Sequence, residues 1–307
     1  MDTVIARPYN GATDFAAVGR FLVDTYSRHG WMYNWGIERW EIQRFSVTTA
    51  AELAGKRTWE QYTRIWEVDR EIVGVAHPED GGDLWVEVDP DFRYLEDEMF
   101  AWGEQHRSPA HPSHGPLVTY VVDGDSLREP LLRKRGWTRG ELKAHLRRRS
   151  MPGSLPTGPV PDGYVVRSLD LSTERDSKGR AAISRASFGH ERTGEMTRVL
   201  AQAPSYLPEL DLAAIAPDGT FAAYTTVWWE PVNRYIIFEP VGTHPEHRRR
   251  GLASAVMAEG LRRSMALDPV TAYVGSGAGQ PSNTLYDSLG FNEVTNYIRW
   301  EAPSAGS

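Results

Sequence analysis

The middle of the chain carries a segment, residues 151–163, that is dense in Pro and Gly and has no periodicity. Such composition is typical of an interdomain linker. Short landmarks on its two sides resemble one another in order and in spacing: residues 88–93 resemble 243–248, and residues 132–137 resemble 286–291. Matching landmarks in a fixed order indicate an internal duplication. We therefore expect two related domains, residues 1–150 and residues 164–307.

Composition excludes several classes of protein. The 307-residue chain has 40% hydrophobic residues and no cysteine, which rules out disulfides, thiolate metal sites and a cysteine nucleophile. Its net charge of −7 argues against a nucleic-acid partner. The first residues lack the basic start and apolar core of a signal peptide, and no apolar run approaches the ~20 residues that span a bilayer. We expect a cytoplasmic protein without a membrane partner.

The second half predicts a mixed α/β fold. Apolar or alternating runs rich in β-forming residues predict four strands, and helical spacing of apolar residues predicts two helices. Asp218-Gly219 is typical of a hairpin turn, Asp268-Pro269 of a helix end, and Gly290 of a helix C-cap. The predicted strands are residues 212–215, 221–228, 235–241 and 271–274, and the predicted helices are residues 249–266 and 282–289.

The junction between the third strand and the first helix has the character of a phosphate site. A helix N-terminus offers unpaired backbone N–H groups and a partial positive charge. Gly251 and Ala253 are small enough to let a pyrophosphate approach those groups, and Arg248, Arg249 and Arg250 add positive charge. The alternative is a solvated basic helix start with an incidental glycine.

This segment resembles the coenzyme A signature of the GNAT superfamily of acyl-CoA-dependent N-acyltransferases. The resemblance rests on Arg248-x-x-Gly251-x-Ala253 after a strand, followed at the family's distance by Leu285-Tyr286 and Gly290-Phe291. It is sharp over residues 238–291, fainter back to residue 164, and degenerate over residues 1–150. It implies an α/β fold of two tandem GNAT-like domains, each a mixed, largely antiparallel sheet flanked by helices.

The resemblance implies an acetyl-CoA site with these roles. The strand before the helix splays from its neighbour, and backbone groups of Val241 and Thr243 bind the pantetheine arm while the amides of 249–253 bind the pyrophosphate. An amine then attacks the thioester directly. Glu239 is the expected general base, with a structural carboxylate as the alternative and His244 as the reserve base. Tyr286 is the expected general acid, with a ring packed under the cofactor and no proton role as the alternative. The expected cofactor-binding residues are Val241, Gly242, Thr243, Arg248, Arg249, Arg250, Gly251, Leu252, Ala253, Asn283 and Tyr286.

Two departures from the family pattern bear on this expectation. Many members carry an Asn seven residues before the Tyr, where this chain has Gly279, and Asn283 follows four residues later. The N-terminal copy has residues 93–97, Arg-Tyr-Leu-Glu-Asp, in place of the signature, and Leu132 in place of the tyrosine. We expect that copy not to bind coenzyme A.

Other motifs have simpler interpretations. Residues 275–279 are glycine-rich after a strand, but their spacing and Pro281 disfavour a dinucleotide loop. The histidines lack a third metal ligand at helical spacing, so we expect no metal; they are His106, His111, His114, His244 and His247. Of Trp228 and Trp229, one is expected in the core and the other in the core or an acceptor pocket. Packing or a domain interface is the expected role of Trp31, Trp35 and Trp40.

Two function classes remain open. One is an N-acetyltransferase acting on a small-molecule or peptide amine; a two-domain GNAT subgroup of this length makes mycothiol, so a thiol-precursor amine is one option. The other is a coenzyme A-binding regulatory or scaffold protein without catalysis. An intact Glu239 and Tyr286 favour the enzyme. The sequence identifies neither the acceptor nor the choice between monomer and homodimer.

Overall fold

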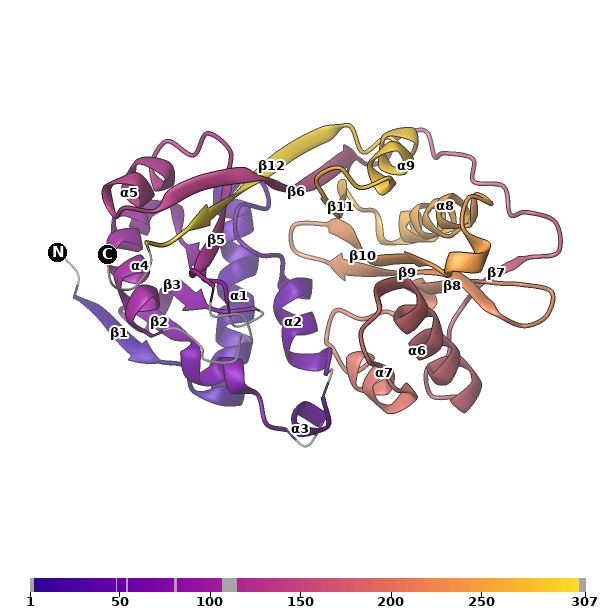
Figure 1. Cartoon of the computed structure of the whole chain (residues 1–307), viewed down its shortest axis with the longest axis horizontal. Helices are drawn as coiled ribbons and strands as arrows, with labels where there is room; N and C mark the ends of the chain where they lie inside the picture. The colour runs from indigo at the N-terminus through magenta and orange to yellow at the C-terminus, as the bar shows by residue number, and fades with distance from the viewer. Residues whose placement is uncertain (1–2, 48, 54, 80–81, 107–114, 304–307) are drawn as a thin grey trace. The chain divides into compact units, whose positions relative to one another are not determined.

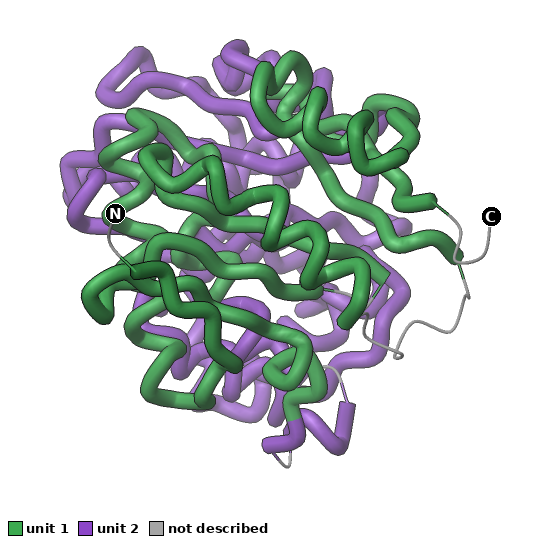
Figure 2. Tube along the Cα trace, turned by 90° about the vertical axis from the view of Figure 1, so that its left-hand side faces the viewer, with its two compact units in different colours: residues 1–40, 57–145, 295–307 green, residues 41–56, 146–294 purple. Residues whose placement is uncertain are grey.

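A computed structural model describes residues 3–47, 49–53, 55–79, 82–106 and 115–303 of the chain. Its contacts divide the chain into two compact units (Figure 2). Unit 1 comprises residues 1–40, 57–145 and 295–307, and unit 2 comprises residues 41–56 and 146–294. Among the helices described, none combines the length and the apolar character needed to cross a membrane.

Unit 1 contains a four-stranded antiparallel sheet in the order β1-β2-β3-β4. Large aromatic side chains of its core, Trp40 and Trp66 among them, are fully buried. The strands are β1 (Val4–Pro8), β2 (Arg64–Val68), β3 (Glu71–His77), β4 (Trp85–Val88) and β5 (Val118–Val122), and the helices are α1 (Gly11–His29), α4 (Glu96–Gln105) and α5 (Arg128–Lys134). Helix α2 (Ile37–Phe45) runs from unit 1 into unit 2, which also holds α3 (Ala50–Leu53).

Unit 2 contains strands in the order β11-β10-β9-β8-β7, all antiparallel except for the parallel pair β10–β11. Figure 1 shows α6 and α7 on one face of these strands and α8 and α9 on the other. The strands are β7 (Val165–Ser168), β8 (Asp211–Ile215), β9 (Phe221–Glu230), β10 (Tyr235–Thr243) and β11 (Thr271–Gly277), and the helices are α6 (Glu174–Phe188), α7 (Gly194–Leu200), α8 (Leu252–Ser264) and α9 (Ser282–Ser288).

Two long strands each pass from one unit into the other. Strand β6 (Thr138–Ser150) leaves unit 1 after residue 145, and strand β12 (Glu293–Glu301) leaves unit 2 after residue 294. The C-terminal strand then pairs antiparallel with β5 and buries Ile298 and Trp300 in the core of unit 1. The N-terminal unit is therefore completed by the end of the chain. The linear domain boundaries 1–150 and 164–307 stay a prediction.

The elements agree with the sequence patterns except at their ends. Asp218-Gly219 forms the expected turn between β8 and β9, where the Gly219 N–H donates to the Ala216 carbonyl (2.9 Å). The expectation that a helix begins at Arg249 is wrong: α8 begins at Leu252. Arg249 and Gly251 have φ angles of +61° and +79°, and a left-handed residue does not fit a right-handed helix.

The aromatic residues singled out in the sequence are mostly core residues. Trp228 is 1% exposed and Trp229 is half-buried against the core of unit 2. Trp35 and Trp40 are buried in the core of unit 1, while Trp31 is half-buried. Packing is therefore the observed role of the buried tryptophans.

Candidate active site

The site in unit 2 begins where β10 and β11 separate. Their parallel pairing ends at Phe238 and Val274, although β10 continues to Thr243 and β11 to Gly277. On its other side β10 stays paired with β9, with a register shift between Phe238 and Val241. Pro240 lies within this shift and has no N–H to donate to a neighbouring strand. One edge of β10 is therefore open beyond Phe238.

Backbone alternation shows which groups lie on the open edge. The His244 N–H donates to the Ala222 carbonyl of the β9 side (2.9 Å). In an antiparallel pair, alternate residues direct their backbone groups toward the same edge, so Gly242 also faces β9 while Val241 and Thr243 face the opening. The Thr243 carbonyl accepts a bond from Arg248 Nε (3.4 Å), which agrees with this orientation. The expected pantetheine contacts, Val241 and Thr243, thus have the required orientation.

The open edge leads to the N-terminus of α8. The first N–H groups of a helix have no intrahelical partner, and the first turn of α8 contains no acidic side chain to take them. The positive φ angles of Arg249 and Gly251 turn the chain into a concave loop before the helix. A Cβ built on Gly251 meets no atom within 4 Å. The loop therefore presents backbone N–H groups to open space, as a phosphate site requires.

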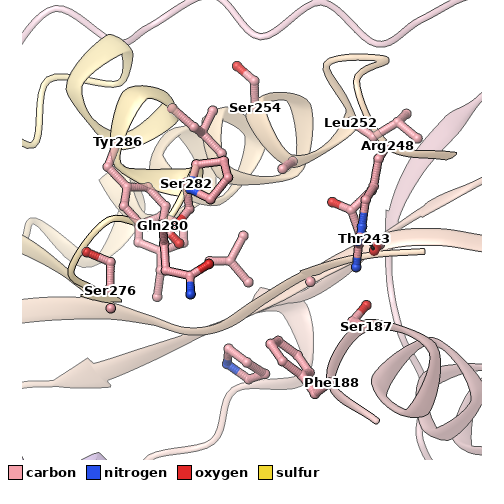
Figure 3. A pocket seen from close by; sticks show the side chains of 18 of the residues that line it. Ser187, Phe188, Thr243, Arg248, Leu252, Ser254, Ser276, Gln280, Ser282 and Tyr286 are labelled. Carbon is pink, nitrogen blue, oxygen red and sulfur yellow. Dashed lines mark hydrogen bonds between the residues drawn. The ribbon is translucent and has the colours of Figure 1, made fainter. Parts of the chain in front are cut away.

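A cavity of about 870 Å³ connects these features (Figure 3). Of the residues expected from the sequence, those that line it are Glu239, Val241, Gly242, Thr243, Arg248, Arg249, Gly251, Leu252, Ala253 and Tyr286. Residues that line it without having been expected are Ser187, Phe188, Phe238, Pro240, His247, Ser254, Gly275, Ser276, Gly277, Gln280, Pro281, Ser282 and Leu285. Most of these unexpected lining residues lie at the ends of strands and helices. No local sequence pattern indicates that such positions face the cavity.

Three expected residues do not line the cavity. Arg250 donates to the Tyr164 hydroxyl (3.2 Å), and the His244 ring accepts from the Glu246 N–H (3.3 Å). Asn283 accepts from Ser276 Oγ (2.7 Å) and Arg147 Nε (3.1 Å), and donates to the Gly277 carbonyl (3.2 Å). Asn283 thus ties α9 to the end of β11 and supports the wall from behind. The cofactor contacts of Arg250 and Asn283 and the role of His244 as reserve base remain predictions.

The histidines do not form a metal site in the described part of the chain. His247 Nδ1 lies 2.9 Å from the Tyr164 hydroxyl, so its ring is engaged with a phenol and not with a carboxylate. No group of three or more His, Asp or Glu side chains is placed to hold an ion among the described residues. His111 and His114 lie outside those residues.

Tyr286 occupies the end of the cavity at α9, apart from Ser187 and Phe188 of α6 (Figure 3). Its side chain is 4% exposed and packs near Phe291, with ring centroids 6.4 Å apart. Burial raises the pKa of Tyr286, and the negative charge of Glu239 adds to this, while a hydrogen bond with Ser282 and the charge of Arg147 act in the opposite direction. The raised pKa keeps the phenol protonated at neutral pH, as a general acid must be.

The corresponding position in unit 1 is filled by the protein's own charges. Helix α4 begins with three acidic residues, Glu96–Glu98. Buried Glu96 accepts from Arg93 Nε (2.6 Å) and Arg128 Nε (3.0 Å), and Arg93 also binds Asp125 at 2.9 Å. The three acidic residues add negative charge to the first turn of α4, where a phosphate would otherwise meet the partial positive charge of the helix N-terminus. This arrangement supports the expectation that unit 1 does not bind coenzyme A.

Comparisons with known proteins agree with this geometry. Residues 182–291 match the sequence model of the Acetyltransferase (GNAT) family. A GCN5-related N-acetyltransferase from Sphaerobacter thermophilus is similar in structure over 97% of this chain and 94% of its own, with a TM-score of 0.61 at 18% identity. A tandem GNAT protein from the clavulanic acid biosynthesis pathway is similar over 99% of this chain and 100% of its own, with a TM-score of 0.63 at 14% identity.

A GNAT-family acetyltransferase from Colwellia psychrerythraea is similar over 98% of this chain and 100% of its own, with a TM-score of 0.57 at 11% identity. No curated protein sequence matches the chain. The chain thus carries a GNAT-family domain at residues 182–291 and has the fold of tandem GNAT proteins throughout. This confirms the resemblance and the fold class that the sequence motifs indicated.

Proposed function

We propose that this protein is an acetyl-CoA-dependent N-acetyltransferase with one active site per chain, which transfers the acetyl group directly to a primary amine. The observation that carries the proposal is the continuity of the cavity from the open edge of β10 to the N-terminus of α8. An extended pantetheine arm pairs with a free strand edge as another strand would, and a pyrophosphate suits the free N–H groups of a helix start.

The proposed roles follow from position and charge. Val241 and Thr243 bind the pantetheine amides, and the amides of 249–253, with Arg248 and Arg249, bind the phosphates. Glu239 lines the cavity on β10, where it is placed to take a proton from the incoming ammonium group. The neutral amine then attacks the thioester carbonyl, and the tetrahedral intermediate collapses with loss of the thiolate.

Tyr286 is proposed to protonate that thiolate. A thiol has a reference pKa of about 8.5 and a phenol of about 10, so the transfer is slightly uphill in water and depends on the dry surroundings of Tyr286, which is 4% exposed. Glu239 and Tyr286 line the same cavity, and the charge of Glu239 acts on the phenol. A base and an acid at one cavity are what direct transfer requires.

A thiol-release assay tests the proposal. The chain has no cysteine, so a thiol reagent reports free coenzyme A without background from the protein. Turnover of acetyl-CoA that depends on an added amine, with the acetylated amine seen by mass spectrometry, is the expected result. Calorimetry should show one acetyl-CoA site per chain. Binding at one site with no turnover on a broad amine panel would instead identify a silent coenzyme A-binding protein.

A further inference from the structure

The loop between α6 and α7 carries a buried arginine whose hydrogen-bonding capacity is mostly unused. Arg192 is 7% exposed, and its Nη2 donates to Ser46 Oγ (2.8 Å). Its Nε and Nη1 are also buried, and neither has a hydrogen-bond partner among the residues that the structure describes. A buried guanidinium with free N–H groups is costly, because it has lost water without replacing it.

The buried arginines of this region differ in their partners. Nearby Arg180, 2% exposed, is balanced by buried Asp211, whose Oδ1 lies 3.3 Å from its Nε. Within the described residues no ion pair joins Arg192 to a carboxylate. Burial and the charge of Arg180 lower the pKa of Arg192, while Tyr224 and Glu52 act in the opposite direction. Arg192 therefore lies within the field of Glu52, but no carboxylate is hydrogen-bonded to it within the described residues.

Two further unpartnered donors lie beside the cavity. Ser187 Oγ and the Tyr224 hydroxyl are buried and have no hydrogen-bond partner in the described part of the chain. Both side chains contact Gly242: a Cβ there would lie 2.9 Å from Ser187 Oγ and 2.5 Å from Tyr224 Cε1. Ser187 and Gly242 line the cavity, and Figure 3 shows Ser187 beside Phe188 across from Thr243. Of the unpartnered donors, Ser187 Oγ therefore lies at the cavity wall, at the end of α6.

We propose that the acceptor amine carries a carboxylate, which Arg192 binds with the help of Ser187 and Tyr224. The proposal rests on the proposed function and names its substrate class: amino acids or peptides with a free carboxyl group. A carboxylate is acceptor-only, so its two oxygens can accept from the unpartnered N–H and O–H groups, and its charge suits a guanidinium.

Binding requires a small opening, because Arg192 Nε and Nη1 are covered. Phe188 is 46% exposed and meets the Tyr224 ring edge-on, with centroids 6.3 Å apart. It borders both the cavity and Tyr224, so rotation of its exposed ring opens the way toward the donors. The carboxylate would then lie on the α6 side while the amine points toward Glu239.

Matched acceptor pairs test the proposal by steady-state kinetics. Each amino acid is compared with its amide, for example glycine with glycinamide, and O-phosphoethanolamine represents phosphate-bearing amines. The wild type should prefer the acids. Arg192→Gln should raise KM for the acids by roughly 10- to 100-fold, through loss of charge-assisted bonds, and leave KM for the amides and for acetyl-CoA unchanged. Arg175→Gln, an exposed arginine of α6, is the matched control.

A binding measurement without turnover separates this proposal from the proposed function. Amino acids should raise the melting temperature of the wild type and of Arg192→Lys, which keeps the charge, but not that of Arg192→Gln. Preference for amides or phosphoamines, or equal loss of all acceptors in Arg192→Gln, would overturn the proposal while acetyl transfer stands. Carboxylate stabilisation without any transfer would support Arg192 as the anion site and reject the proposed function.

Discussion

Removal of one hydroxyl group tests the chemistry assigned to Tyr286. The Tyr286→Phe variant keeps the ring, which packs in the core with Phe238 and Phe291. If Tyr286 donates the proton to the leaving thiolate, turnover should fall roughly 10²- to 10⁴-fold, the usual contribution of general acid catalysis, which corresponds to about 2.7–5.4 kcal/mol of barrier. Acetyl-CoA affinity should change little, because the open edge of β10 and the start of α8 are untouched.

The same substitution has a small expected effect on folding. It removes the hydrogen bond between the Tyr286 hydroxyl group and Ser282, and a neutral hydrogen bond contributes about 1 kcal/mol. Tyr273 on β11, 1% exposed and outside the cavity lining, provides the control. Tyr273→Phe also removes a buried hydroxyl group, so it should cost similar stability and leave turnover unchanged.

The pH dependence gives a second criterion. Because burial raises the pKa of Tyr286, the phenol stays protonated below the ordinary value of about 10 and loses its proton only above it. Wild-type kcat should therefore keep its alkaline limb above about pH 10, and Tyr286→Phe should lack that limb. Stopped-flow or thiol-release kinetics at saturating acetyl-CoA measure both. Intact kcat with weakened acetyl-CoA binding would show that the hydroxyl group is a binding group and refute its role as the acid.

Three further predictions concern the phosphate loop, the base and the charge cluster of unit 1. Gly251→Val should weaken acetyl-CoA binding by several kcal/mol, because it removes charge-assisted bonds of about 1.5–3 kcal/mol each. Calorimetry measures this loss. Gly219→Val, at a turn glycine with a similar φ (+89°) outside the cavity, is the control and should leave the affinity for acetyl-CoA unchanged. Glu239→Gln should reduce the turnover rate most near pH 7, and the rate should recover at high pH, where the amine is already neutral. A loss of rate that is constant over pH, or no loss, would exclude Glu239 as the base. Glu246→Gln on the surface is the control. Burial alone would raise the pKa of Asp125, but the Arg128 N–H, the Tyr33 hydroxyl and the charges of Arg128 and Arg93 lower it to about 2. This stabilisation, about 2 kcal/mol, is present above the unfolded-state pKa of 3.8 and is lost as pH falls toward 2, so urea unfolding of Asp125→Asn should show a deficit at pH 7 that disappears in acid.

The local patterns of unit 2 were sufficient for much of the fold and part of the site. Alternation and apolar runs predicted β8 to β11, because a strand that packs on both faces consists of consecutive apolar residues and can be recognised from a short segment of sequence. Arg248-x-x-Gly251-x-Ala253 predicted an open loop before α8, and Gly251 has a φ of +79° with open space at its Cβ position. Phosphate binding by that loop stays a prediction. These features depend on neighbours in the chain.

The pairing of the C-terminal strand β12 could not be predicted from local sequence patterns. Residues 295–303 belong to the predicted second domain in sequence, yet β12 pairs with β5 and buries Trp300 in the core of unit 1. Asn283 is a similar case: the family resemblance suggested a cofactor contact, which stays a prediction, and only the structure shows that its amide is bound to Ser276 and Gly277. Strand pairing and hydrogen-bond partners over long separations depend on the assembled backbone.

The sequence by itself determined the GNAT domain, which the family match confirms at residues 182–291, because the motif depends on residue types at fixed short spacing. The phosphate-binding role of residues 248–253 and its loss in the N-terminal copy stay predictions. Only the tertiary structure decided where the open edge of β10 begins, which side chains face the cavity, and that Arg192 is buried with two unpartnered N–H donors. Residues 187, 224 and 242 are far apart in the chain and meet only because α6, β9 and β10 pack together.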